Sequence, residues 1–293
     1  MSLRFLLAPL ALLLIGATAP SPEPARPPLW KLSDADTTIY LFGTVHALPR
    51  GLQWKTGHVA SAFAASDTLV VEVVEPDDMA SMAGAMMAMG KAAPGSLPPL
   101  MERVPADKRA ALKALLDKSP LPPQLLDGCK TWFAALVLAA PSIAQAGLDP
   151  ESGADRRLMS DARQRHMRMI GLETIDEQLG YFNGLAEDDQ RALLVSMVDD
   201  TADSGVEFAA LIHAWSSGDI QGIEKLADDE LKASPHIRDL LLKSRNRHWA
   251  DWLARRMKAP GTLFMAVGAG HLSGADSVQA MLRAQGYRID RVQ

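Results

Sequence analysis

The chain has 293 residues and a formal net charge of −5 at pH 7, with 30 lysine and arginine residues against 35 aspartate and glutamate residues. A mildly acidic chain without a basic patch is not expected to bind nucleic acid, and the lack of a polybasic run argues against an anionic membrane surface as a partner. A single cysteine excludes an internal disulfide, so the fold must depend on its hydrophobic core.

The first residues have the three regions of a secretory signal. Arg4 precedes an apolar run over residues 5–15, which is too short to span a bilayer, and the small residues 16–19 follow it. We therefore expect residues 1–19 to be a signal peptide and residues 20–28 to be a proline-rich linker. Pro20 is unfavourable for processing and leaves the exact cleavage site open. The mature protein is expected to be periplasmic or secreted, without a transmembrane span.

The next part of the chain is predicted to form a strand, helix, strand unit. Residues 37–42 and 68–74 are rich in β-branched and apolar side chains, which is typical of buried strands. The amphipathic stretch 56–66 lies between them and is predicted to be a crossover helix, which makes the two strands parallel. Residues 168–172 are predicted to form a third central strand.

The middle of the chain is predicted to be mostly helical. Helices are expected over residues 107–117, 130–146, 153–166, 187–203, 220–233 and 236–257. We interpret residues 79–257 as a large helical insertion that forms a cap over the strand ends. An independent helical domain is the alternative, although no linker-like segment separates it from the rest.

The end of the chain repeats the plan of its beginning. Residues 262–267 are predicted to be a strand, 277–285 a helix and 287–292 a final strand. We therefore predict one α/β (α+β) domain over residues 29–293. Its small mixed β-sheet would be built from two units, each consisting of a strand, a GxxH segment, a helix and a strand.

Each of these units places a histidine just beyond a strand. Gly43 precedes His46, and Gly268 precedes His271, by three residues. Glycine directly after a strand permits a sharp turn, so each imidazole is presented at the strand's end, where open α/β sheets place their chemistry. Two unrelated turns with capping histidines are the alternative, but the repeated device favours one shared site.

Two glutamates extend this predicted site. Glu72 lies in the second strand with apolar neighbours on both sides, where a carboxylate needs a partner, and Glu173 ends the third strand. Histidines and carboxylates that meet at a sheet edge can hold a divalent metal ion or divide general acid and base roles. A structural salt bridge from Glu72 to an arginine is the alternative interpretation.

Five segments, in this order, resemble the motifs of the TraB/GumN family. They are residues 41–46, 70–73, 171–174, 245–249 and 267–274. The resemblance extends over about residues 29–292. This family is similar to the TIKI proteins, which are described as manganese- or cobalt-dependent metalloproteases, and is grouped with erythromycin-esterase-like and ChaN-like proteins.

The resemblance implies an exported metal-dependent hydrolase, foremost a peptidase, that acts on a peptide or small molecule. It implies that His46, Glu72 and His271 are catalytic residues that hold a divalent ion, with Mn²⁺ or Co²⁺ favoured and Zn²⁺ possible. Glu173 would be a further ligand or the base. Arg245 would stabilise the oxyanion.

Two further residues are predicted to bind substrate. Asn246 belongs to the fourth motif, and Asp155 follows Gly153 in a pattern that the family tends to show. The alternative to catalysis is a periplasmic binding or assembly factor, related to polysaccharide or peptide signals, that retains the pocket. The sequence leaves the substrate and the oligomeric state open.

Overall fold

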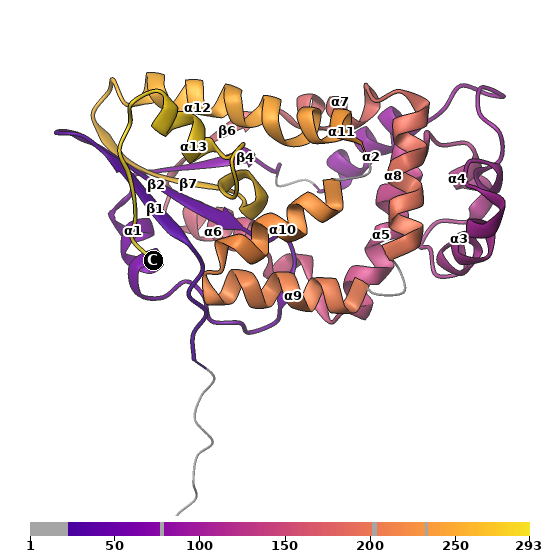
Figure 1. The fold of residues 1–293 in the computed structure, drawn as a ribbon, viewed down its shortest axis with the longest axis horizontal. Coiled ribbons are helices and arrows are strands. Elements are labelled where there is room, and N and C mark those ends of the chain that lie inside the picture. The colour runs from indigo at the N-terminus through magenta and orange to yellow at the C-terminus, as the bar shows by residue number, and fades with distance from the viewer. Residues whose placement is uncertain (1–22, 77–78, 201–203, 232–233) are drawn as a thin grey trace, which may run out of the picture.

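A computed structural model describes residues 23–76, 79–200, 204–231 and 234–293 of the protein. The predicted signal peptide and the start of the predicted linker lie outside these residues. The described chain combines a mixed six-stranded sheet at one end with many helices, which confirms the predicted α/β class (Figure 1). Among the described residues, none of the helices combines the length and the apolar character that a membrane span requires.

The central sheet has the spatial strand order β6-β4-β7-β2-β1-β8. Its strands are β1 (Leu29–Ser33), β2 (Thr37–Thr44), β4 (Thr68–Val73), β6 (Arg168–Glu173), β7 (Gly261–Gly268) and β8 (Ile289–Arg291). The strands β6, β4, β7 and β2 run parallel, whereas β1 is antiparallel to both of its neighbours. Strand β7 from the end of the chain lies between β4 and β2, so folding brings the two GxxH segments side by side.

Helices cover both faces of this sheet. On one face lie α1 (Gly57–Ala65) and α6 (Ala154–Gln164), and on the other lie α12 (Ser244–Arg256) and α13 (Val278–Ala284). This arrangement follows from the alternation of apolar side chains along each strand, which leaves both faces of the parallel strands in need of cover.

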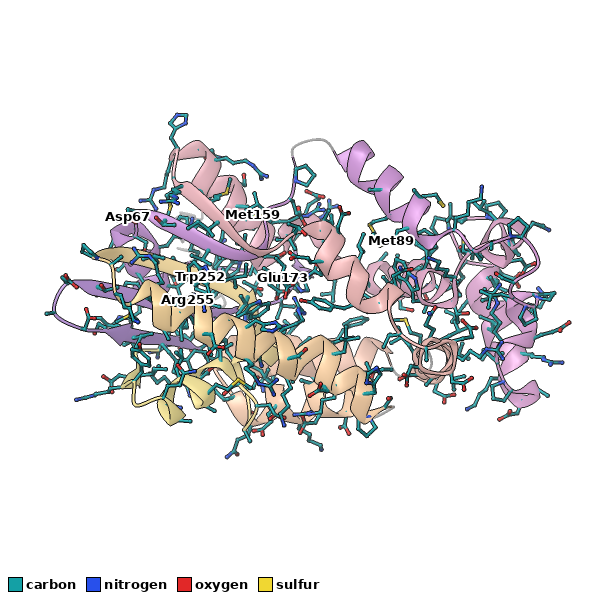
Figure 2. All side chains as sticks on the ribbon, turned by 90° about the horizontal axis from the view of Figure 1, so that it is seen from above. Asp67, Met89, Met159, Glu173, Trp252 and Arg255 are labelled. Atoms are coloured by element: carbon teal, nitrogen blue, oxygen red, sulfur yellow. The ribbon has the colours of Figure 1, made fainter. Side chains whose placement is uncertain are left out.

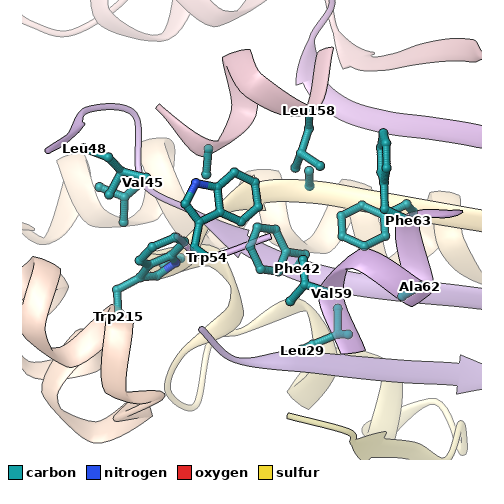
Figure 3. Close-up of a cluster of buried hydrophobic side chains, with 14 of the residues drawn as sticks. Leu29, Phe42, Val45, Leu48, Trp54, Val59, Ala62, Phe63, Leu158 and Trp215 are labelled. Carbon is teal, nitrogen blue, oxygen red and sulfur yellow. The ribbon is translucent and has the colours of Figure 1, made fainter. Parts of the chain in front are cut away.

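Strand β4 shows this alternation directly. Val71 packs in the cluster that contains α1 and α6, and Val70 packs in the cluster that contains α12 and α13. In the first cluster, Phe42 of β2 stacks on Trp54 with ring centroids 5.5 Å apart (Figure 3). Burial of each such side chain stabilises the fold by about 1.5–3 kcal/mol. These cores fix the ends of β2, β4 and β7 relative to one another.

The remaining helices extend away from the sheet. They are α2 (Met79–Gly90), α3 (Arg109–Leu116), α4 (Pro123–Asp127), α5 (Thr131–Gln145), α7 (Ile175–Asn183), α8 (Glu187–Asp200), α9 (Ser204–Ser217), α10 (Ile220–Leu231) and α11 (Pro235–Arg238). Helices α3, α5 and α8 enclose a separate apolar cluster around Leu112, Leu138 and Leu194. Figure 1 shows these three helices at the end of the molecule that lies away from the sheet.

Most of the predicted helices are present, within the described residues. Those predicted over residues 107–117, 130–146 and 153–166 correspond to α3, α5 and α6, and α8 and α10 begin where predicted. Helices α4, α7 and α9 and strand β1 were not predicted. The predicted range 79–257 also contains β6, which belongs to the sheet, and α6 and α12, which cover it.

The helix predicted over residues 236–257 is present, but it is not a regular α-helix throughout. A π-helical turn over Asp239–Lys243 joins α11 to α12 without a break. Such turns widen the helix locally and often occur at functional sites. Here the turn precedes Arg245, whose Nη1 donates to the carbonyl oxygen of Leu241 at 3.1 Å. The irregular turn therefore helps to fix the direction of the Arg245 side chain.

Candidate functional site

Predicted site residues from both ends of the chain meet where the parallel strands end. Glu72 lies near the end of β4, and Gly268 ends β7. A Cβ atom placed on Gly268 would lie 3.2 Å from Glu72 Oε1, 3.5 Å from His271 Cδ2 and 3.9 Å from His46 Nε2. The structure therefore brings His46, Glu72 and His271 around one point. It also explains the glycine, because a side chain here would enter the space between them.

Arg245 of α12 connects the two glutamates. Its Nη2 donates to Glu72 Oε2 at 2.7 Å, while its Nε and Nη2 donate to the two oxygens of Glu173 at 2.8 Å each. The two carboxylates and the guanidinium are all largely buried, and Glu173 lies near the middle of the molecule in Figure 2. A planar guanidinium suits such a two-pronged contact, which an ammonium group cannot reproduce.

Glu72 accepts two further hydrogen bonds. The backbone N–H of Gly268 donates to its Oε1 at 2.7 Å, and Gln178 Nε2 donates to its Oε2 at 3.1 Å. Burial alone would raise the pKa of Glu72, but His271, Arg245 and His46, together with the Gly268 N–H, lower it to about 2. Because His271 is itself neutral near pH 7, we attribute the ionisation of Glu72 there chiefly to Arg245.

His271 is held by its neighbours on α12. Its Nδ1 lies 2.6 Å from Asn246 Oδ1, and its Nε2 lies 3.2 Å from Arg245 Nη1. Asn246 Nδ2 donates to the carbonyl oxygen of Asp276, which turns its own Oδ1 toward the imidazole. Nδ1 therefore carries the proton and Nε2 accepts from Arg245. Burial, with repulsion by Arg245 and His46, outweighs the attraction of Glu72 and lowers the pKa of His271 to about 3.

His46 is paired with Asp155 at the start of α6. His46 Nδ1 lies 3.2 Å from Asp155 Oδ2. Burial would lower the pKa of His46, but the hydrogen bond and charge of Asp155, followed by the charges of Glu72 and Glu75, raise it to about 9. Because the His46 side chain is 68% exposed, water weakens the burial and charge effects alike. We therefore attribute the raised pKa of His46 to its direct contact with Asp155.

The local backbone fixes this pair. The N–H of Ala154 donates to the carbonyl oxygen of Val45 at 2.9 Å, so the first turn of α6 is tied to the loop that carries His46. A Cβ atom on Gly153 would collide with the carbonyl oxygen of His46, and only glycine permits this approach. The Gly-x-Asp pattern is thus a packing requirement that places Asp155 beside the imidazole.

A pocket of about 360 Å³ opens at this edge of the sheet. Its polar lining includes Thr44, His46, Glu72, Asp155 and Gln178, and its apolar lining includes Met86, Leu136, Leu179 and Phe182. The polar residues come from the strand ends and the adjoining turns of α6 and α7, and the apolar ones from α2, α5 and α7. The pocket therefore lies between the sheet and the helices that extend from it, a common position for a ligand site.

Four predicted site residues lie outside the pocket lining, and their catalytic and binding roles stay predictions. They are Glu173, Arg245, Asn246 and His271. Arg245 is engaged with two carboxylates and is not placed to contact an oxyanion there, while Asn246 is fully buried and orients His271. Glu173 serves as the second partner of Arg245. The salt bridge from Glu72 to an arginine, considered above as the alternative, is present, but Glu72 also lines the pocket.

The donor set does not fit a metal ion in this arrangement. Within the described residues, no three histidine, cysteine, aspartate or glutamate side chains form a group that could hold one. Arg245 contacts Glu72 Oε2 and His271 Nε2, and the Gly268 N–H donates to Glu72 Oε1, so these predicted ligand atoms already have hydrogen-bond partners. Arg245 supplies the positive charge between these groups, and the metal ion stays a prediction.

Thr44 and Gln178 line the pocket but were not singled out from the sequence. Thr44 directly follows Gly43 in the first GxxH segment, so its position at a strand end was a usable signal. Gln178 lies on α7, which was not predicted as a helix. The capping box between Thr174 and Glu177, with Thr174 Oγ1 accepting from the Glu177 N–H, is the signal that could have located that helix.

Lowering the pH is expected to destabilise the protein through His271. Its pKa is about 3 when folded and about 6.5 when unfolded, so the unfolded chain binds more protons between these values. The contribution to stability is full above pH 6.5 and is lost as the pH falls toward 3, by up to about 1.4 kcal/mol per pH unit. Denaturant unfolding at pH 7.5, 6 and 5 should show a weaker pH dependence in His271→Gln than in wild type or in a His58→Gln control. Equal slopes would contradict this assignment.

Sequence comparisons give the same family as the motifs. The TraB/PrgY/gumN family model matches residues 28–291. The uncharacterized protein YbaP of Escherichia coli strain K12 is 29% identical over 186 residues, which cover 63% of this chain and 68% of YbaP, and YbaP of Shigella flexneri matches equally. An uncharacterized protein of Treponema pallidum is 20% identical over 268 residues, which cover 87% of this chain and 79% of the relative. No solved structure matches significantly.

Proposed function

The chain belongs to the TraB/PrgY/gumN family, and we propose that it is a hydrolase of amide or ester bonds in which His46, held by Asp155, is the general base. The observation that carries this proposal is the pairing of an accessible imidazole with a carboxylate at the polar end of the pocket. The signal pattern of residues 1–19 further supports action outside the cytoplasm, on a peptide or another small molecule.

The contact with Asp155 sets the state of the imidazole. When Nδ1 donates to Asp155 Oδ2, the lone pair of Nε2 is the basic one, and Nε2 lies on the side of Gly268 and Glu72. A histidine held by a carboxylate in this way is oriented for proton transfer. Asp155 therefore acts as the positioning residue of the pair.

In the proposed reaction, His46 accepts a proton in the first step and gives it back in the second. Nε2 of His46 takes a proton from a water molecule as its oxygen forms a bond to the substrate carbonyl carbon. The imidazolium then returns the proton to the leaving nitrogen or oxygen as its bond to that carbon breaks. Asp155, Glu72 and Glu75 carry negative charge toward His46 and stabilise the imidazolium between these steps. Neutral His46 is the active form, so turnover should rise with pH above neutrality.

Arg245 is proposed to preorganise the site without entering the pocket. Glu72 and Glu173 would repel each other and His271 could change orientation if the guanidinium did not join them. The Gly268 N–H and Gln178 complete the contacts of the Glu72 carboxylate. This network keeps one ionised carboxylate beside His46, where it favours the imidazolium.

A turnover screen with and without a chelator tests this proposal. Purified protein should release product from a panel of short peptides, amides and esters in EDTA. The chelator should have no effect, because the guanidinium of Arg245, and not a metal ion, supplies the positive charge of the site. Turnover that requires added Mn²⁺, Co²⁺ or Zn²⁺ would instead support the metal ion predicted from the sequence and would contradict the role assigned to Arg245. Binding without turnover in either condition would support the non-catalytic alternative.

A further inference from the structure

Two buried polar atoms at the pocket have no hydrogen-bond partner. They are Thr44 Oγ1 and Asp155 Oδ1, and Thr44 is only 2% exposed. Buried polar groups in folded proteins are almost always paired, so each exception needs an explanation. Other described side-chain atoms are also buried without a hydrogen-bond partner, but among them only these two belong to residues that line the pocket. Both residues line the pocket, so a water molecule or a ligand bound there can supply the missing partner.

The backbone around these two atoms is fixed. Thr44 is the last residue of β2 and lies opposite Gly268 of β7 in the parallel pairing. The hydrogen bond from the Ala154 N–H to Val45 joins the residue after Thr44 to the residue before Asp155. The two side chains therefore come from adjoining, mutually bonded segments. A fixed pair of unsatisfied groups is suited to recognising one small polar group of a ligand.

The chemistry of the two atoms specifies that group. A carboxylate oxygen can only accept a hydrogen bond, and the Thr44 hydroxyl can donate one. A secondary amide offers one N–H donor and one carbonyl acceptor and can satisfy both. An ester cannot satisfy Asp155, because it has no donor. The apolar lining by Met86, Leu136 and Phe182 then favours a bulky apolar substituent on the amide.

We propose that Thr44 Oγ1 and Asp155 Oδ1 together recognise a secondary amide attached to a bulky apolar group, and that Thr44 is a specificity-determining residue of this pocket. This assignment rests on the proposed function, because it states which of the two proposed substrate classes, amides or esters, the pocket prefers. Its test is binding, which is measured separately from turnover.

Thr44→Val tests whether the hydroxyl serves the ligand or the fold. Valine has almost the same shape, so removing an unpaired hydroxyl should raise the Tm of the ligand-free protein by a few degrees. Thr37→Val is the matched control, because Thr37 is a buried threonine of the same strand whose Oγ1 donates to the carbonyl oxygen of Ala259 at 2.9 Å. That variant should lose stability and keep ligand binding.

Two ligands separate the roles of the two atoms. In an NMR titration, wild type should bind N-methyl-4-methylpentanamide about fivefold more tightly than N,N-dimethyl-4-methylpentanamide, which has no N–H. Thr44→Val should weaken both about fivefold and keep their ratio, whereas Asp155→Ala should abolish the ratio. N-methylacetamide, without the apolar group, should bind far more weakly than either.

Unchanged binding of both amides in Thr44→Val, or a fall in its Tm like that of Thr37→Val, would overturn the assignment. So would equal binding of the two amides by wild type. These outcomes are distinct from failure of the proposed function, which is an absence of turnover in a protein that still binds the amide.

Discussion

Arg245→Met is expected to destabilise the protein by about 3–5 kcal/mol, because it removes one partner of a buried ion pair and leaves the other uncompensated. Two buried carboxylates, Glu72 and Glu173, would then face each other without the guanidinium that bonds both. His271 Nε2 would lose its partner as well. For a chain of this size the loss corresponds to a fall in Tm on the order of 10 °C, measurable by calorimetry.

Two controls separate this network from a general effect of losing an arginine. Arg255→Met changes an exposed arginine of the same helix and should alter stability by less than about 0.5 kcal/mol. Adding Glu72→Gln and Glu173→Gln to Arg245→Met should recover part of the lost stability, since neutral amides need no cation. A Tm for Arg245→Met within one or two degrees of wild type would show that the guanidinium does not hold the site together.

His46→Ala is expected to lower kcat/KM by about 10²–10⁴-fold, the usual contribution of a general acid–base group. Stability should change little, because the side chain is 68% exposed and its removal leaves the Arg245 network intact. Measuring kcat/KM on the best substrate of the turnover screen, together with the Tm of the variant, checks both parts of this expectation.

His58→Ala is the matched control for His46→Ala. His58 is an exposed histidine of α1 and does not line the pocket, so this variant should retain wild-type kcat/KM. Loss of activity in both variants would indicate an effect of surface histidines in general. Full activity of His46→Ala would remove the imidazole from the reaction.

The convergence of His46, Glu72 and His271 followed from local patterns. The two histidines lie just beyond β2 and β7, and alternation along β4 placed Glu72 with Val70 on one face. The expected sharp turn directly after each strand is not found, because Gly43 and Gly268 belong to the strands and neither has a positive φ. Strand ends of a parallel sheet meet at one edge, which brought these residues together whatever the intervening helices do. Asp155 came from the resemblance, and the structure adds the reason for it in the close approach at Gly153.

The position of Arg245 could not be read from the sequence. Its spacing from Glu72 and Glu173 along the chain says nothing about distance in space, and the π-helical turn that precedes α12 was not visible in the pattern of apolar residues. A motif arginine beside two carboxylates is compatible with an oxyanion role or with an ion pair. The geometry shows the ion pair, and it also shows that Glu72 and His271, two of the predicted metal ligands, contact Arg245.

The parts of the apolar wall formed by α5 and α7 could not be located from the sequence. Met86 and Phe182 lie on α2 and α7, whose apolar residues serve the local cluster around Trp132 and Leu179 as well as the pocket. Apolar side chains occur both in a packed core and in the wall of an apolar cavity, so the residue type does not tell the two apart. The tertiary arrangement alone decides which of them a ligand could touch.

Chemical rescue of His46→Ala by imidazole tests the central claim most directly. The side chain is largely exposed, so its removal leaves room that a free imidazole can reach. In EDTA, the rate should rise in proportion to the concentration of neutral imidazole, while the wild-type rate should not change. No rescue at any imidazole concentration, or rescue only after a divalent metal ion is added, would contradict the account of His46 as the general base.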